Sequence, residues 1–335
     1  MQENDLFSRL KPTTVYLFDN FKKQDMVLCR EEDKKECYET DVFLFIKYFF
    51  DRKNKSFKQR YEDMISDFEE KISQEAPYVD LDNFHKNLES LTVSGYNFFF
   101  YNYMSGKRVK GSYSLINNEI FIDKKGTLRV FGHELLHVAS SVIDGDEYKS
   151  GFHYANIKER IHLGKYFNEG YTEVLADRYL GLRTNPAYAK DKVFAALIED
   201  VVGKQTMERL YFKADIKGLF SELLKYTSED KLVQFFKDVE SNHKLKLDKN
   251  GNITNEQLAC FGRCQSFCLE CYLEKEKQKG LSDKEIGDNY LSYLDSVYLK
   301  TVSGYPNSLY LEVLNRVAKI SYSNVMGVKK SSQRL

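Results

Sequence analysis

The sequence contains 335 residues, with 50 basic and 50 acidic side chains, so its formal net charge is zero. This balance argues against binding to nucleic acid, or to an anionic membrane, through a broad basic surface. Hydrophobic residues make up 42% of the chain, which is enough to bury a sizeable core. Residues 1–11 are polar, and no apolar run reaches the length of a membrane span. We therefore expect a cytoplasmic protein with no signal peptide and no transmembrane segment.

The N-terminal region, residues 1–92, is predicted to be helical. Apolar side chains recur at spacings of three and four residues between Phe57 and Phe68. A strand is expected over 96–103, where aromatic residues are bounded by glycines. This strand opens a mixed region, residues 93–185.

The mixed region continues with alternating elements. Residues 111–123 are predicted to form a strand with one covered face, and the apolar stretch 128–143 is predicted to form a helix. Residues 144–167 are expected to be a loop. A second helix, predicted over 168–180, begins at Asn168, which is a favourable N-cap residue.

The C-terminal region, residues 186–335, is predicted to be almost entirely helical. Thr254 with Gln257, and Ser282 with Glu285, each match the capping box that opens a helix. Taken together, the elements predict an α+β protein that is mostly helical, with a small sheet confined to the middle region.

The strongest functional signal is His133-Glu134-Leu135-Leu136-His137, within the apolar helix. Residues four apart project from the same side of a helix, so both imidazoles can bind one metal ion. Glu134 would lie beside that ion, where its carboxylate can act as a general base on a water molecule. The simpler alternative is a pair of core histidines whose hydrogen bonds are satisfied, with Glu134 in a salt bridge.

A catalytic zinc site needs a third protein ligand and an open coordination position. Glu169 and Glu173 follow downstream and are again four residues apart. One of them can therefore bind the ion while the other hydrogen-bonds a ligating imidazole. An acidic residue in the first turn of a helix is also favoured by the helix dipole alone, which is the simpler explanation.

Residues 133–137, followed by Asn168-Glu169-Gly170-Tyr171-Thr172-Glu173, resemble the gluzincins, the metallopeptidases with two histidines and one glutamate on zinc. The Asn-Glu-Gly start resembles the zinc helix of the aminopeptidase branch. Residues 111–122 resemble the strand that edges the cleft in small gluzincins. The resemblance covers about residues 111–182, and it implies a gluzincin-like catalytic unit with helical regions on either side.

The resemblance also implies specific roles. One Zn²⁺ per chain would be bound by His133, His137 and Glu169. Glu134 would be the general base, and Glu173 would support a ligating imidazole.

Two features depart from the usual gluzincin pattern. The 31 residues between His137 and Glu169 exceed the usual interval. In addition, Glu173-Val-Leu-Ala-Asp177 resembles the Glu-x-x-Ala-Asp segment with which other gluzincin branches bind zinc. In that register Glu173 would be the metal ligand and Tyr166 a candidate oxyanion donor.

These observations predict a zinc metallopeptidase, a hydrolase that acts on a peptide or protein substrate. An extended peptide would be expected to add to the strand near Ile120. The same metal chemistry would serve a non-peptidase zinc hydrolase acting on another amide or ester. A third alternative is a non-catalytic, protein-binding module that zinc stabilises.

A second group of potential ligands is the cysteine stripe, defined as Cys260, Cys264, Cys268 and Cys271. The spacing places all four thiols along one side of a single helix. Thiolates that bind one ion must converge from a turn or from two elements. We therefore expect the stripe to be reduced, buried and free of metal.

Three further signals are weaker. Residues 248–254 look like a calcium loop but lack the glycine and glutamate that such a loop requires, so a turn is expected there. His153 and His162 lie between the two zinc-binding segments, and either could donate to an oxyanion. An ordinary loop histidine is the simpler interpretation of each.

Overall fold

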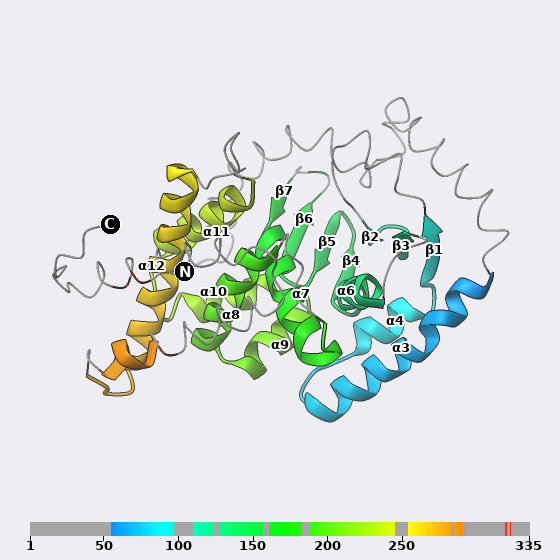
Figure 1. Cartoon of the computed structure of the whole chain (residues 1–335), viewed down its shortest axis with the longest axis horizontal. Helices are drawn as coiled ribbons and strands as arrows, with labels where there is room; N and C mark the ends of the chain where they lie inside the picture. The colour runs from blue at the N-terminus through cyan, green and yellow to red at the C-terminus, as the bar shows by residue number, and fades with distance from the viewer. Residues whose placement is uncertain are drawn as a thin grey trace.

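A computed structural model describes residues 55–96, 110–123, 128–156, 158, 161–182, 188–244, 254–282, 285–290, 292, 319 and 322. These residues form an α+β structure that is mostly helical, as the sequence predicted. In Figure 1 one small sheet lies in the middle of the molecule and a second lies toward the end that carries helix α3 (Lys55–Glu75), while helix α12 (Asn255–Lys277) lies at the opposite end. None of the helices in the described ranges is both long enough and apolar enough to cross a bilayer.

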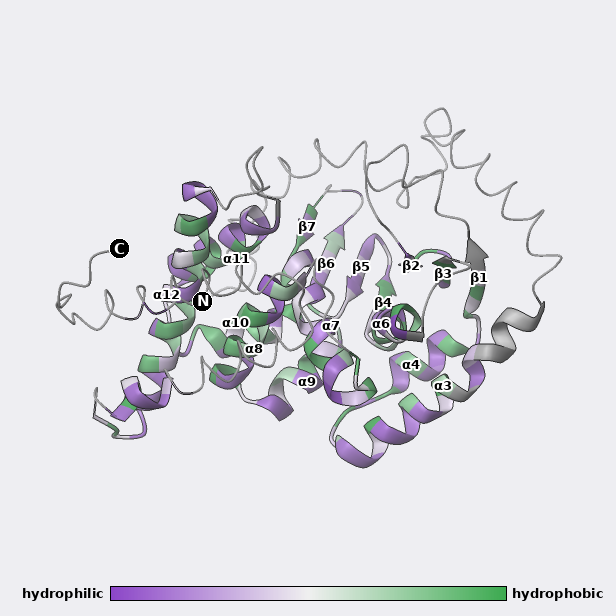
Figure 2. Cartoon of the chain, viewed as in Figure 1, coloured by the Kyte–Doolittle hydropathy of each residue, from purple (hydrophilic) through white to green (hydrophobic). Residues whose placement is uncertain are grey.

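The first described elements are α3 (Lys55–Glu75) and α4 (Asp82–Leu88), which agree with the predicted helical pattern. Tyr61, Phe68 and Ile72 are buried along one side of α3. Tyr61 stacks on Phe131 of a later helix with ring centroids 4.3 Å apart. These contacts fix helix α3 against the centre of the molecule. Figure 2 shows that hydrophilic and hydrophobic residues alternate along the helix.

The first sheet contains β1 (Thr92–Tyr96), β2 (Gly111–Ser114) and β3 (Glu119–Asp123) in the order β1-β3-β2. Strand β3 runs parallel to β1 and antiparallel to β2. The strand predicted over 111–123 is therefore a hairpin rather than one strand. The strand predicted over 96–103 begins earlier, at Thr92, and its remainder lies outside the described residues.

The position of Ile120 in this sheet contradicts one expectation. Ile120 pairs with Val93 of β1 on one side and with Tyr113 of β2 on the other. A peptide cannot add to a strand whose two edges are already paired. Strand β2 borders the sheet on the side of the next helix, α6 (Leu128–Ala139), and no other described strand pairs with its outer edge.

Helix α6 (Leu128–Ala139) carries the His-Glu-x-x-His sequence but is shorter than predicted. The helix ends at Ala139, where serine hydroxyl groups donate hydrogen bonds to the backbone carbonyl groups of its last turn. Ser140 Oγ donates to Leu136 O at 2.9 Å, and Ser141 Oγ donates to His137 O at 2.5 Å. The chain then continues directly as a strand.

The segment predicted to be a loop is in fact a four-stranded antiparallel sheet. Its strands follow in chain order: β4 (Ser141–Asp144), β5 (Glu147–Ser150), β6 (His153–Asn156) and β7 (Ile161–Leu163). We call this sheet the meander. It accounts for the long interval between His137 and Glu169.

The remaining described helices are α7 (Lys165–Leu180), α8 (Ala189–Val202), α9 (Lys204–Phe212), α10 (Ile216–Leu223), α11 (Glu229–Lys244) and α12 (Asn255–Lys277). Helices α8 to α12 confirm the helical character predicted beyond residue 186 for the part of that region that the structure describes. The capping box of Thr254 and Gln257 is formed, and Ser282 and Glu285 make the same reciprocal contacts.

The cysteine stripe lies on α12 and is buried, as predicted. All four side chains are at most 2% exposed. Cys264, Cys268 and Cys271 belong to one continuous apolar core, which also includes residues of α3, α6, α7 and α8. The calcium-like segment 248–254 falls outside the described residues except for Thr254.

Close packing between α7 and α8 depends on Gly170. A Cβ atom at this position would lie 2.3 Å from the backbone carbonyl of Asp191 and 2.8 Å from the Lys192 nitrogen. The glycine therefore lets the beginning of α8 approach α7 at the level of Glu169.

We predict that Gly170→Ala destabilises the fold by about 2 kcal/mol. The alanine gains about 1 kcal/mol in helix propensity, but overpacking against rigid backbone costs about 3 kcal/mol. Gly132→Ala in α6 is the matched control, because its Cβ would meet the movable ends of Leu180 and Leu182. Urea unfolding of both variants measures the difference, and equal midpoints would contradict the close-packing role.

Candidate metal centre

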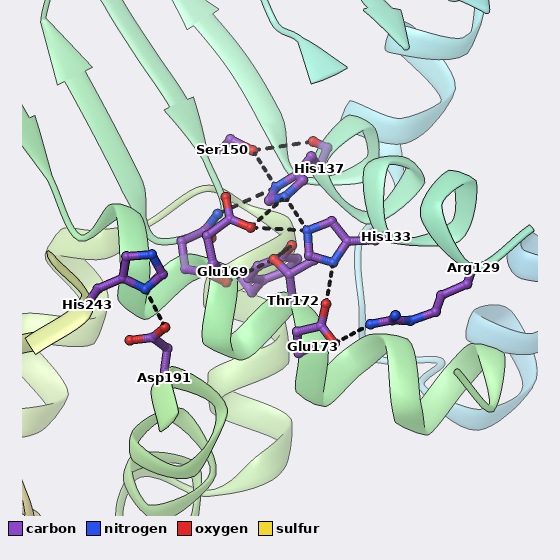
Figure 3. A network of polar contacts seen from close by, with 11 residues as sticks. Arg129, His133, His137, Ser150, Glu169, Thr172, Glu173, Asp191 and His243 are labelled. Atoms are coloured by element: carbon purple, nitrogen blue, oxygen red, sulfur yellow. Dashed lines mark hydrogen bonds and ion pairs between the residues drawn. The ribbon is translucent and has the colours of Figure 1, made fainter. Parts of the chain in front are cut away.

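Three side chains from two neighbouring helices converge on one point (Figure 3). His133 and His137 project from α6, and their Nε2 atoms are 3.2 Å apart. Glu169 reaches across from α7, with its Oε2 atom 3.1 Å from His133 Nε2 and 3.7 Å from His137 Nε2. One atom from each residue lies within 4.8 Å of the other two, so a single ion could contact all three.

Glu173 lies behind His133 rather than beside the convergent atoms. Its Oε1 atom is 2.9 Å from His133 Nδ1, the ring nitrogen that faces away from Glu169. Its other oxygen is 3.5 Å from an Arg129 guanidinium nitrogen. Asp177, which the alternative register would require behind a ligand, instead pairs with Lys192 at 3.0 Å. The geometry thus separates the two glutamates into different positions.

His137 is held at its outer nitrogen by neutral groups. Ser150 Oγ of the meander and Asn168 Nδ2 of α7 each lie 3.5 Å from His137 Nδ1. Asn168 is therefore not the N-cap that the sequence predicted, since α7 begins one turn earlier, after Gly164. Its Oδ1 atom accepts the Phe152 backbone N–H at 2.8 Å and so ties the meander to the metal centre.

The electrostatics of the convergent groups favour a positive charge between them. Burial alone would lower the pKa of His133, but Glu169 and Glu173 outweigh it and raise that pKa well above its ordinary value. Burial would likewise raise the pKa of Glu169, but His137 and His133 hold it well below its usual range. Such a site stabilises a cation, whether a proton or a metal ion.

Glu134 lies between α6 and the edge strand β2. Its side chain is buried, and burial raises its pKa despite the neighbouring histidines. The backbone of Tyr113 donates a hydrogen bond to its carboxylate. A Cβ atom on Gly111 would lie 3.6 Å from Glu134 Oε1, which confirms that β2 passes close to this group.

Helix α7 is anchored on its other side by a buried polar network. Arg178 pairs with Glu199 of α8 and with Glu208 of α9 at 2.5 Å each. Tyr171 donates to Glu199 at 2.6 Å, and Tyr179 donates to Glu208 at 2.7 Å. These bonds keep the helix that carries Glu169 and Glu173 in a fixed position.

A group of residues lies beside this centre, which we call the aromatic wall: Tyr166, Tyr188, Asp191 and His243. Sequence reasoning had named Tyr166 as a candidate oxyanion donor but missed the other three. Tyr188 lies nearly parallel to the His133 ring, with centroids 5.8 Å apart. Asp191 Oδ2 accepts from His243 Nδ1 at 2.8 Å, and Tyr166 stacks on the His243 ring at 3.6 Å. The three missed residues come from the start of α8 and from α11, which are distant in sequence from the two zinc-binding segments, so no local spacing could reveal them.

His153 and His162 also differ from expectation. Both are strand residues of the meander rather than loop residues. Their rings lie side by side, with His153 Nε2 3.2 Å from His162 Nδ1. They are not part of the convergent group.

Two imidazoles and one carboxylate form a ligand set that suits a divalent transition ion such as zinc. No protein-family model matches the chain, and no curated protein or solved structure is significantly similar to it.

Proposed function

We propose that this protein is a zinc-dependent metallopeptidase with a gluzincin-like catalytic unit. The observation that carries the proposal is the convergence of His133 Nε2, His137 Nε2 and Glu169 Oε2 within 4.8 Å. Glu134 adds a buried carboxylate between the helix that holds both histidines and an edge strand. Two histidines with a purely structural role in the core would not require a glutamate oxygen facing both Nε2 atoms, nor a second buried carboxylate beside them.

The residues present fit a zinc ion. Each imidazole presents Nε2 toward Glu169, while its Nδ1–H can donate to Glu173 in one case and to Ser150 Oγ in the other. Such outer contacts orient metal-binding histidines. When bound, zinc would supply Lewis acidity, which polarises a carbonyl group and lowers the pKa of a water molecule.

Glu134 is the proposed general base. It would accept a proton from the attacking water and pass it to the nitrogen of the leaving amine. The raised pKa of Glu134 suits this role, because a carboxylate whose pKa lies closer to neutral pH is a stronger proton acceptor. The hydrogen bond from Tyr113 would orient the carboxylate.

The substrate backbone would align with β2. This strand is the edge nearest to Glu134, and extended peptides bind such edges through main-chain hydrogen bonds. The position near Ile120, which the sequence first suggested, is already filled by β1 and β2.

Tyr188 is the proposed oxyanion donor in place of Tyr166. The surrounding carboxylates Glu169, Glu134 and Glu173, together with burial, raise the pKa of Tyr188 well above its ordinary value. The phenol therefore stays protonated and can donate a hydrogen bond. The Tyr166 ring packs more closely on His243, with centroids 3.6 Å apart, than the Tyr188 ring does, with centroids 5.8 Å apart.

We predict that Tyr188→Phe lowers kcat for peptide cleavage by about 10²–10³-fold, with zinc content unchanged. Tyr166→Phe is the matched control and should retain most activity. Steady-state kinetics and metal analysis of both variants decide the assignment. A large loss in Tyr166→Phe alone would return the oxyanion role to Tyr166.

The proposed metal centre is tested by zinc content. We predict about one tightly bound zinc per chain in the wild type and almost none in His133→Ala or His137→Ala, because each variant loses a ligand. Elemental analysis after dialysis, with unfolding measured in parallel, checks this. Full zinc retention by both variants would refute the site. Zinc retention without hydrolysis of any peptide, amide or ester would favour the non-catalytic module.

A further inference from the structure

The meander holds a second pair of imidazoles outside the metal centre. His153 begins β6, and His162 lies on the neighbouring antiparallel strand β7. Their facing nitrogens are 3.2 Å apart, and the two rings are nearly parallel, with centroids separated by 5.4 Å. The strand pairing thus holds both rings in one arrangement.

The strand register shows which way these rings face. Ser150 pairs directly with His153, and Ala155 pairs directly with His162. Directly paired residues, and residues two apart on a strand, project from the same face of a sheet. Because Ser150 contacts His137 from that face, both histidines lie on the side of the meander that faces the metal centre.

The separation of the ring nitrogens matches that of the first pair. His133 Nε2 and His137 Nε2 are also 3.2 Å apart. We propose that His153 and His162 form a second, weaker metal site for a divalent transition ion that prefers imidazole ligands, such as Zn²⁺ or Cu²⁺. This site is independent of the proposed peptidase activity.

The protonation state of His153 supports metal binding at neutral pH. Burial, His162 and Lys165 together hold the pKa of His153 well below its ordinary value. A histidine must be neutral to bind a metal ion. When both rings are neutral, one ring donates its N–H to the other. That hydrogen would move to the ring's other nitrogen when the ion binds, so no proton is released.

Two features make this site weaker than the first. The ring centroids are 5.4 Å apart, against 4.9 Å for His133 and His137, although the nitrogens are equally close. The rings therefore point more directly at each other and must rotate to share an ion. Within the described ranges, no further histidine, cysteine or carboxylate joins the pair in a three-residue group. Water would complete the coordination.

Zinc titration of the folded protein, followed by calorimetry, tests the second site. The wild type should show one tight and one weak class of binding. His162→Gln should retain the tight class and weaken the second by at least about tenfold, since one of two ligands is lost. His133→Ala should lose the tight class and retain the weak one. His85→Gln, which removes a histidine paired with Glu69 at the surface, should change neither class.

Copper binding provides a second measurement. In the His133→Ala background, electron paramagnetic resonance of one equivalent of Cu²⁺ should show coordination by two imidazole nitrogens. This signal should disappear when His153→Gln is added. An unchanged signal, or an unchanged weak class in His162→Gln, overturns the second site. The absence of the tight class in the wild type would contradict the proposed metal centre but not the second site. The two proposals can therefore fail separately.

Discussion

Replacing Glu134 by glutamine is expected to lower kcat/KM for peptide hydrolysis by about 10²–10⁴-fold, the contribution typical of a general base. The amide keeps the size and shape of the carboxylate but cannot accept a proton. The backbone hydrogen bond from Tyr113 can be kept through the amide oxygen. Zinc content and the unfolding midpoint should therefore remain at wild-type values.

The measurement combines kinetics on peptides that the wild type cleaves with elemental analysis of the same samples. Glu147→Gln is the matched control, because Glu147 lies on β5 and pairs with Lys149 at 2.7 Å, away from the convergent ligands. This control should retain full activity. A Glu134→Gln variant that cleaves as fast as the wild type would exclude the general-base role, whatever its zinc content.

Local spacing was sufficient to predict part of this site. The separation of His133 and His137 predicts one shared helical face, and the structure places both nitrogens there. The separation of Glu169 and Glu173 predicts two carboxylates on adjacent turns of α7, which the structure also shows. Periodicity of this kind is a property of one helix and needs no tertiary information.

The meander was missed because its strands are short. Each has three or four residues, which is too few to show a clear alternation of apolar and polar side chains. Its turns depend on left-handed glycines, Gly145 with φ of 60° and Gly151 with φ of 55°. Those glycines were visible in the sequence, but they are equally compatible with a loop.

The aromatic wall, apart from Tyr166, could not be predicted, for a different reason. Tyr188, Asp191 and His243 reach the metal centre only because α8 and α11 pack against α7. Gly170 permits that approach because the backbone of α8 lies where its Cβ atom would be. Such a contact between distant segments leaves no periodic signal in the sequence. The contacts of Asn168 could not be predicted either. Its position in the sequence suggested a helix cap, whereas in the structure its side-chain amide lies between the meander and His137.

The identity of the third ligand is the remaining choice within the metal centre. Glu169 Oε2 faces the Nε2 atoms of both histidines, whereas Glu173 Oε1 faces only the outer nitrogen of His133. Loss of a direct ligand should remove nearly all zinc affinity. Loss of a carboxylate that orients a ligating histidine typically costs 10–100-fold.

We therefore expect Glu169→Ala to be free of zinc after mild dialysis and Glu173→Ala to retain zinc with about 10–100-fold weaker affinity. Competition with a chelator of known affinity measures both variants on one scale. Arg129→Gln serves as a control, because it removes only the more distant partner of Glu173, at 3.5 Å, and should weaken binding least. The reverse order of the two glutamates would make Glu173 the ligand. It would also require Asp177 to leave Lys192, and it would restore Tyr166 as the candidate oxyanion donor.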